Sequence, residues 1–75
     1  MQSIAKAKPG TIGIVAKLEG EARFLSRAAA IGLTPGCPVE ILRSEKNQPV
    51  LIYSRDTVIA LSRREGEKIM LEVTT

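Results

Sequence analysis

The sequence predicts a mainly β protein: a small five-stranded barrel with one short α-helix inserted after the first strand and a short helical turn before the last strand. Five short apolar runs rich in Ile, Val and Leu are separated by turn residues, at intervals of about eight to twelve residues. Between the first two runs, residues 22–31 instead repeat their apolar positions at helical spacing. Together these patterns favour strands that wrap around a single helix.

Length and composition bound the class of protein. A chain of 75 residues is expected to form one domain, residues 1–75, with a small core that the two aromatic residues, Phe24 and Tyr53, leave mainly aliphatic. A single cysteine, Cys37, excludes an internal disulfide and is typical of a reducing compartment. No run reaches the ~18 apolar residues of a membrane span, and no secretory signal is visible. We therefore expect a cytoplasmic protein without direct membrane insertion.

The first expected strand covers residues 11–18. Its alternation predicts one buried face, made of Ile12, Ile14, Ala16 and Leu18. Gly13 within the strand indicates a bulge or a close approach of another backbone. Residues 1–8 before it are expected to be a tail that touches the body through Ile4 and Ala5.

The helix, residues 22–31, is too short to be stable alone, so we expect Phe24, Leu25 and Ile31 to dock on the sheet. Gly32 can adopt the left-handed conformation that ends a helix, and Leu33 can then fold back onto Ala28. Pro35 and Gly36 suit the central positions of a type II turn, after which the chain becomes β-branched. These residues predict a corner that leads from helix to strand.

The remaining strands are expected at residues 39–43, 50–54, 57–61 and 69–73. Arg55 and Asp56 separate the third strand from the fourth, which predicts a hairpin. Residues 63–67 are expected to form the single helical turn before the last strand, in which Ile69, Leu71 and Val73 should point inward.

The residue types give little support for catalysis. The sequence has no histidine, so the usual general base at neutral pH is missing and Cys37 has no activating partner. A transition-metal site needs histidine or several cysteines, and the glycine spacing does not match a phosphate-binding loop. We expect a non-enzymatic protein with no cofactor and no metal site within one chain.

The net charge of +3 permits an acidic partner, but the basic residues are scattered along the chain. Arg63 and Arg64 are adjacent, and Glu65 and Glu67 follow them directly. With only two aromatic residues for base stacking, this composition favours ordinary solubility over nucleic-acid binding.

Two motifs make the chain resemble the FeoA family of ferrous iron transport proteins: IGLTPG at residues 31–36 and IALSRRE at residues 59–65. The resemblance runs from about residue 8 to residue 73 of the sequence. It implies an SH3-like barrel and a cytosolic accessory of the FeoB-type membrane GTPase transporter, held at the inner face of the membrane through that partner. A similar domain ends the iron-dependent repressors. Ala28 and Gly66 depart from the family pattern, in which a larger aliphatic residue and an alanine are usual.

The helix and the corner after it are the predicted partner-binding surface. An apolar centre with a charged rim is typical of a modest protein interface. The candidate residues are Arg23, Leu25, Arg27, Ala28, Leu33 and Pro35. Packing of the apolar ones onto the barrel is the alternative interpretation. Two other functions stay open: a self-associating or peptide-binding SH3-like module, and a small nucleic-acid-binding barrel.

Overall fold

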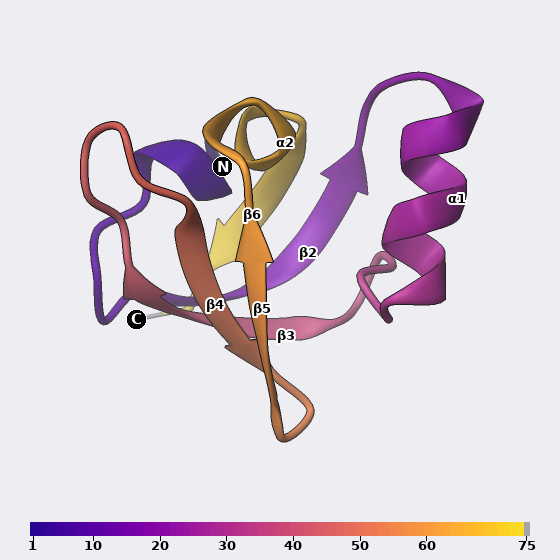
Figure 1. The fold of residues 1–75 in the computed structure, drawn as a ribbon. Helices are drawn as coiled ribbons and strands as arrows, with labels where there is room; N and C mark the ends of the chain where they lie inside the picture. The colour runs from indigo at the N-terminus through magenta and orange to yellow at the C-terminus, as the bar shows by residue number, and fades with distance from the viewer. Residues whose placement is uncertain (75) are drawn as a thin grey trace.

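The computed structural model describes residues 1–74, which form one antiparallel sheet of six strands in the order β1-β6-β2-β3-β4-β5 (Figure 1). The strands are β1 (Gln2–Ser3), β2 (Ile12–Leu18), β3 (Pro38–Arg43), β4 (Val50–Ser54), β5 (Thr57–Leu61) and β6 (Ile69–Val73). The helical elements are η1 (Ile4–Lys6), α1 (Ala22–Ala30) and α2 (Arg63–Glu67). The mainly β prediction is confirmed, with both helical segments in the expected places.

The sheet curls around its core without closing, so it has two edges, β1 and β5. Five strands were predicted, and β1 is an additional one in the segment expected to be a tail. Gln2 pairs with Leu71 and Ser3 with Met70, and the following residues Ile4 and Ala5 are buried. The first residues are therefore part of the sheet through Gln2 and Ser3, and part of the core through Ile4 and Ala5.

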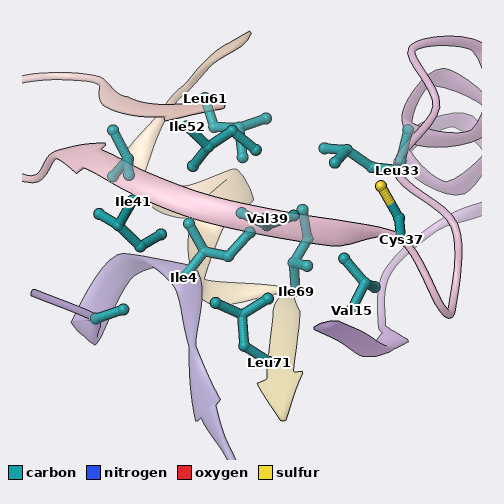
Figure 2. Packing of buried hydrophobic residues seen from close by; sticks show 13 residues of the cluster. Ile4, Val15, Leu33, Cys37, Val39, Ile41, Ile52, Leu61, Ile69 and Leu71 are labelled. Carbon is teal, nitrogen blue, oxygen red and sulfur yellow. The ribbon is translucent and has the colours of Figure 1, made fainter. Parts of the chain in front are cut away.

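The core is aliphatic, as the composition predicts (Figure 2). Its fully buried side chains come from four strands, η1 and the corner after α1: Ile4, Val15, Leu33, Cys37, Val39, Ile41, Val50, Ile52, Ile69 and Leu71. Burial of each large aliphatic side chain is worth about 1.5–3 kcal/mol. Stability therefore comes from many small contributions, made by side chains spread over the strands, η1 and the corner after α1.

The predicted buried face of β2 is wrong in its first half. Ile12 and Ile14 are exposed, whereas Gly13 and Val15 face the core. A β-carbon on Gly13 would lie 2.8 Å from the carbonyl oxygen of Glu72 in β6, so the expected close approach of a backbone is confirmed. Either phase of this alternation is apolar enough to be buried, and the contact between β2 and β6 selects the one with glycine inside.

A bulge corrects the phase later in the same strand. The register of β2 against β6 shifts between Val15 and Lys17. This extra residue turns Leu18 toward the core, against which it packs half-buried. This bulge lies three residues beyond Gly13 and was not predicted, since Gly13 itself takes the alternative of a close backbone approach. A bulge near the end of a strand re-aims the side chains that follow it.

The predicted end of α1 is confirmed. Gly32 has φ +90°, and the Leu33 N–H donates to the Ala28 carbonyl at 2.9 Å while the Gly32 N–H donates to the Ala29 carbonyl at 3.0 Å. These two bonds form a Schellman motif, which brings the side chains of Leu33 and Ala28 into the same cluster. The last helical residue is Ala30, one earlier than predicted.

The turn that follows is also as predicted. Gly36 has φ +93°, and the Cys37 N–H donates to the Thr34 carbonyl at 3.0 Å, as a type II turn requires. Cys37 is fully buried, with its sulfur 3.0 Å from the hydroxyl oxygen of Ser54 in β4. The cysteine therefore packs as a small core residue.

The helix does not dock along a whole face, which corrects the expectation for its apolar residues. Leu25 and Ile31 are exposed, Phe24 is half-buried, and Ala28 is the buried residue of α1. The helix stands beside the sheet (Figure 1) because it is attached mainly at Ala28 and at the Leu33 that follows its end. Two sides of α1 consequently face open space.

The hairpin between β4 and β5 is confirmed. Ser54 pairs with Thr57, and the two residues between them, Arg55 and Asp56, both have positive φ, as a type I′ turn requires. In β6, Ile69 and Leu71 are buried as predicted, whereas Val73 is exposed because the strand leaves the core at its last two residues.

Candidate functional site

Two depressions flank α1, one on each side. The first, here called the apolar groove, has a volume of about 330 Å3 and lies between α1, β2 and the corner after the helix. Its lining residues are Ala16, Lys17, Leu18, Leu25, Ala29, Leu33, Thr34 and Pro35. Its lining from β2, residues 16–18, includes the bulged part of that strand.

The second depression, here called the basic cleft, has a volume of about 390 Å3 and lies between α1 and α2. Its lining residues are Glu21, Arg23, Phe24, Arg27, Ser62, Arg64, Glu65 and Lys68. Four cationic side chains thus face two carboxylates, so the cleft carries an excess of positive charge.

The apolar groove is suited to an apolar side chain from another molecule. Leu25 is part of its lining and is 39% exposed. Leu33 forms the floor, and Pro35 forms the opposite rim. An apolar insertion here would remove water from the exposed side chains of Leu25 and Pro35, at about 25 cal/mol per Å2 of buried surface.

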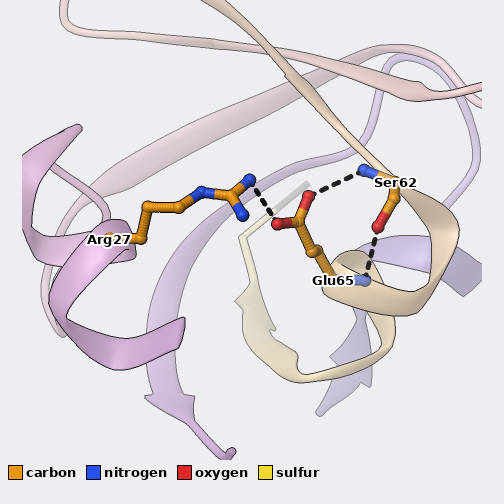
Figure 3. Close-up of polar contacts among 3 residues, drawn as sticks. All are labelled: Arg27, Ser62 and Glu65. Atoms are coloured by element: carbon orange, nitrogen blue, oxygen red, sulfur yellow. Dashed lines mark hydrogen bonds and ion pairs between the residues drawn. The ribbon is translucent and has the colours of Figure 1, made fainter. Parts of the chain in front are cut away.

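The basic cleft is crossed by an ion pair between Arg27 of α1 and Glu65 of α2 (Figure 3). Glu65 also accepts a hydrogen bond from the Ser62 N–H at 3.0 Å, and the Glu65 N–H donates to the Ser62 hydroxyl at 3.1 Å. These reciprocal bonds are a capping box, which begins α2. The carboxylate of Glu65 is held by the cap and therefore gives Arg27 a fixed partner.

A cation–π contact also joins two residues that line the basic cleft. The ammonium nitrogen of Lys68 lies 5.1 Å from the centre of the Phe24 ring. Such a contact contributes about 0.5–1 kcal/mol at an exposed position. Within residues 1–74, Arg23 and Arg64 form no ion pair, so their charges are available to an acidic partner.

The six predicted site residues are divided between these depressions. Leu25, Leu33 and Pro35 line the apolar groove, whereas Arg23 and Arg27 line the basic cleft. Ala28 lines neither. The structure thus brings together five of the six, as two sets on opposite sides of the helix.

Two of the predicted residues offer little surface. Ala28 is 4% exposed and Leu33 is 1% exposed, which corrects the expectation that both face a partner. The physical reason is the Schellman end, which folds Leu33 beneath the helix against Ala28. A partner in the groove reaches Leu33 only as its floor, and Ala28 acts by fixing the helix.

Sequence reasoning missed the contribution of α2 to the site. Arg64 of this short helix and Lys68, its C-cap residue, line the basic cleft. The signal for the helix was present, since Ser62 followed three residues later by Glu65 is the pattern of a capping box. Its proximity to α1 was not readable, because the two helices are more than 30 residues apart in the chain.

The described residues show neither a metal centre nor a membrane span. Among residues 1–74, no three side chains of His, Cys, Asp or Glu gather closely enough to hold a metal ion. No helix in that part of the chain has both the length and the apolar character needed to cross a membrane. The two depressions beside α1 are the ones that contain the predicted partner-binding residues.

Comparisons with known proteins agree on the family and the fold. A family model described as "FeoA domain" matches residues 2–73. The "Putative Fe(2+) transport protein A" of Methanocaldococcus jannaschii is 32% identical over 72 residues, which are 96% of this chain and 87% of that protein.

Solved structures share the fold at lower identity. The crystal structure of an iron uptake regulatory protein, FeoA, superposes with a TM-score of 0.91 at 24% identity and covers 96% of both chains. The zinc complex of Stenotrophomonas maltophilia FeoA, described as an SH3 domain protein, has a TM-score of 0.81 at 16% identity and covers 96% of this chain and 91% of that one. A manganese-dependent transcriptional repressor matches at TM-score 0.90 and 15% identity, over 97% of this chain and 41% of the repressor.

These likenesses confirm the expected SH3-like fold, here as an open sheet with α1 inserted between β2 and β3. The family follows from sequence. Since the FeoA model matches residues 2–73 and a transport protein A is 32% identical along nearly the whole length, the chain belongs to the FeoA family.

Proposed function

We propose that this protein is a non-enzymatic accessory of ferrous iron uptake that binds the cytosolic portion of an FeoB-type membrane GTPase transporter and regulates it. Membership of the FeoA family supports an iron-transport role. The description of the Methanocaldococcus jannaschii relative as an Fe(2+) transport protein supports the same role. In this proposal the protein acts in the cytoplasm, at the inner face of the membrane, through contact with the transporter.

The observation that carries the proposal is the unpartnered apolar groove. Its lining is mostly apolar, and two of its lining side chains, Leu25 and Pro35, are exposed to solvent. Exposed apolar surface next to a polar rim is a common mark of a protein interface. The groove therefore supplies the apolar centre of the proposed contact.

The basic cleft on the other side of α1 supplies charge to the same contact. Arg23 and Arg64 have no ion-pair partner within residues 1–74, and both line the cleft. Such charges raise the rate of association with an acidic surface. Salt screens this attraction at separations beyond the Debye length of about 8–10 Å. We expect the transporter surface to place an apolar side chain in the groove and carboxylates opposite the cleft.

The test is a titration of the purified cytosolic portion of the transporter from the same organism with this protein, by isothermal calorimetry. Leu25→Asp should weaken binding by roughly tenfold or more, since it places a charge in the apolar centre. Leu25 is exposed, so the variant should keep its fold. The matched control is Val73→Asp, because Val73 is similarly exposed at 42% and lies on β6 outside both depressions.

Each outcome decides something. The proposed partner is overturned if wild-type protein shows no heat of binding in the calorimeter and does not co-elute with the transporter's cytosolic portion in gel filtration. Leu25→Asp that binds as tightly as Val73→Asp, with an unchanged unfolding temperature, removes the groove from the interface. Ala28→Asp is unsuitable for this purpose because Ala28 is buried and the variant would lose stability.

A further inference from the structure

Strand β5 is an open edge of the sheet. It pairs with β4 on one side, and no strand within residues 1–74 lies on the other. Its five residues, Thr57–Leu61, are uncharged and contain no proline. Natural sheets usually protect an edge with charge, proline, a bulge or short length. The opposite edge follows that rule, since β1 has only two residues, whereas β5 does not.

The outward groups of β5 can be assigned from the hairpin register. In a two-residue hairpin the residues that close the turn, here Ser54 and Thr57, exchange hydrogen bonds with each other. Pairs then alternate along an antiparallel ladder, so the backbone groups of Ile59 bond to β4. Those of Val58 and Ala60 point away from the sheet. No turn or loop hydrogen bond within residues 1–74 uses these outward groups.

The side chains beside this edge are apolar and exposed. Val58 is 57% exposed, and its cross-strand neighbour Tyr53 is also exposed on the same face of the sheet. Ala60 follows on that face. Water therefore covers both a set of unpaired backbone groups and an apolar strip, which a further strand would cover together.

We propose that β5 is a self-association edge, at which two copies of this chain pair their β5 strands antiparallel across a two-fold axis. With Ile59 opposite Ile59 of the second copy, Val58 pairs with Ala60 of the second copy and Ala60 with Val58 of the second copy. Each pair exchanges two backbone hydrogen bonds, which satisfies all the outward groups identified above.

The second copy is the occupant that best matches this edge. Pairing needs a partner strand with free backbone groups, equal length, matching twist and no charge at the seam, and β5 itself has each property. In the two-fold arrangement the β5 edge of each copy is paired with that of the other, so no β5 edge is left for a third copy and the assembly closes at a dimer. It is independent of the proposed transporter contact, because no residue of β5 lines the groove or the cleft.

The contact is small, so the dimer is expected to be weak. A five-residue strand is about 17 Å long, and its pairing covers well under the roughly 1,200 Å2 that stable interfaces bury. We therefore expect a dissociation constant of about 0.1–1 mM. The dimer would form at high local concentration, as when several copies gather at one membrane.

The experiment measures mass and amide exchange over a concentration series from about 20 µM to about 2 mM, which spans the expected Kd. In sedimentation equilibrium the mass should rise from the monomer's 8.1 kDa toward twice that value. In NMR hydrogen exchange the amides of Val58 and Ala60 should slow at least severalfold with concentration, whereas the amide of Ile59, already bonded to β4, should not.

Two variants locate the contact. Ala60→Pro removes an outward N–H without removing a bond to β4, and a proline is tolerated at such an edge position. Val58→Lys places a charge at the seam. Both should keep the protein monomeric over the whole series. The control is Ile14→Lys, since Ile14 is also exposed but lies on β2, where β3 and β6 occupy both edges.

The proposal is overturned by a mass that stays at the monomer value up to about 2 mM, well above the expected Kd. It is equally overturned by a dimer that persists in Ala60→Pro and Val58→Lys, which would place the contact elsewhere. Protection of the Val58 amide without the Ala60 amide would exclude the register centred on Ile59. Thermal unfolding of each variant distinguishes loss of pairing from loss of fold.

Discussion

Arg27 of α1 and Glu65 of α2 form an ion pair across the basic cleft, and the Glu65 carboxylate also completes the capping box of α2 with Ser62. The Glu65 carboxylate thus caps the N-terminus of α2 and also binds the Arg27 side chain of α1. The side chain of Glu65 is only 16% exposed, whereas that of Arg27 is 65% exposed. The two partners should therefore respond very differently to substitution.

Loss of the arginine should cost little. Arg27→Gln removes the ion pair, and because its side chain is mostly in water we expect the free energy of unfolding to fall by less than about 1 kcal/mol. Urea unfolding at low and high salt measures this, and the difference from wild type should shrink in high salt. Arg23→Gln, on the same helix without an ion pair, is the control. A loss that persists in high salt would contradict a screened surface pair.

Loss of the cap should cost more. Ser62→Ala removes the hydroxyl that accepts the Glu65 N–H, and we expect a loss of about 1 kcal/mol in the free energy of unfolding. Ser62→Asp keeps an acceptor at the same position and should retain most of the stability. Equal stability of the alanine variant and wild type would show that the capping box does not stabilise α2.

Gly13 should not tolerate a side chain. Its β-carbon would lie 2.8 Å from the Glu72 carbonyl oxygen, a backbone atom that moves only with β6. We expect Gly13→Ala to lower the free energy of unfolding by about 1–3 kcal/mol.

Gly66→Ala is the matched comparison for that substitution. Its β-carbon would meet the Ala5 nitrogen at 3.2 Å, and alanine within a helix recovers about 0.5–1 kcal/mol. We therefore expect Gly66→Ala to be nearly neutral in the same urea titration. A Gly13→Ala variant as stable as Gly66→Ala would mean that β2 and β6 separate easily.

Tyr53 should titrate above its ordinary value. Its hydroxyl donates to the Asp56 carboxylate at 2.8 Å, and this bond, with smaller effects of desolvation and the Glu40 charge, raises the pKa of Tyr53. The folded state then holds the phenolic proton more strongly than the unfolded state. The resulting stability is fully present below the unfolded pKa of about 10 and is lost as pH rises through the folded pKa.

The measurement is direct, because Tyr53 is the only tyrosine and the sequence has no tryptophan. Ultraviolet absorbance of the phenolate should show a midpoint above about 10 in the folded protein. Asp56→Asn should lower that midpoint, and asparagine tolerates the positive φ that Asp56 adopts. An unchanged midpoint in this variant would exclude the carboxylate as the main cause.

The first residue of the hairpin turn is strained. Arg55 has φ +51°, a left-handed conformation that costs a residue with an ordinary side chain about 1–2 kcal/mol and asparagine less. Arg55→Asn should therefore raise the free energy of unfolding by up to about 1 kcal/mol. Arg55→Gln, which removes the same charge but keeps the conformational preference, should show no such gain in thermal or urea unfolding.

The corner after α1 was predictable because its chemistry is local. Gly32, Pro35 and Gly36 each allow or forbid a particular backbone conformation, and these choices alone define the helix end and the turn. Five of the six strands were predictable in position for a similar reason, since β-branched runs between turn residues favour strands. The exception is β1, whose residues Gln2 and Ser3 carry no strand pattern and pair only because β6 lies beside them.

The face of β2 and the docking of α1 were not predictable, because both depend on distant residues. Ile12 and Val15 are equally apolar, and only contact with β6 decides which is inside. The helix period shows that Leu25 is apolar but not whether the sheet has room for it. The basic cleft requires Arg27 and Glu65 to meet from opposite halves of the chain, which no local pattern encodes.

The segment that carries α1 leaves and returns to the sheet at one place. The Gly36 N–H donates to the Val15 carbonyl at 2.8 Å, and the Val15 N–H donates to the Cys37 carbonyl at 2.9 Å, so the base of this excursion is tied together. The sheet register on either side of the excursion is therefore fixed by backbone bonds that do not involve α1. A change of sequence within the helix should leave the scaffold of strands unaltered.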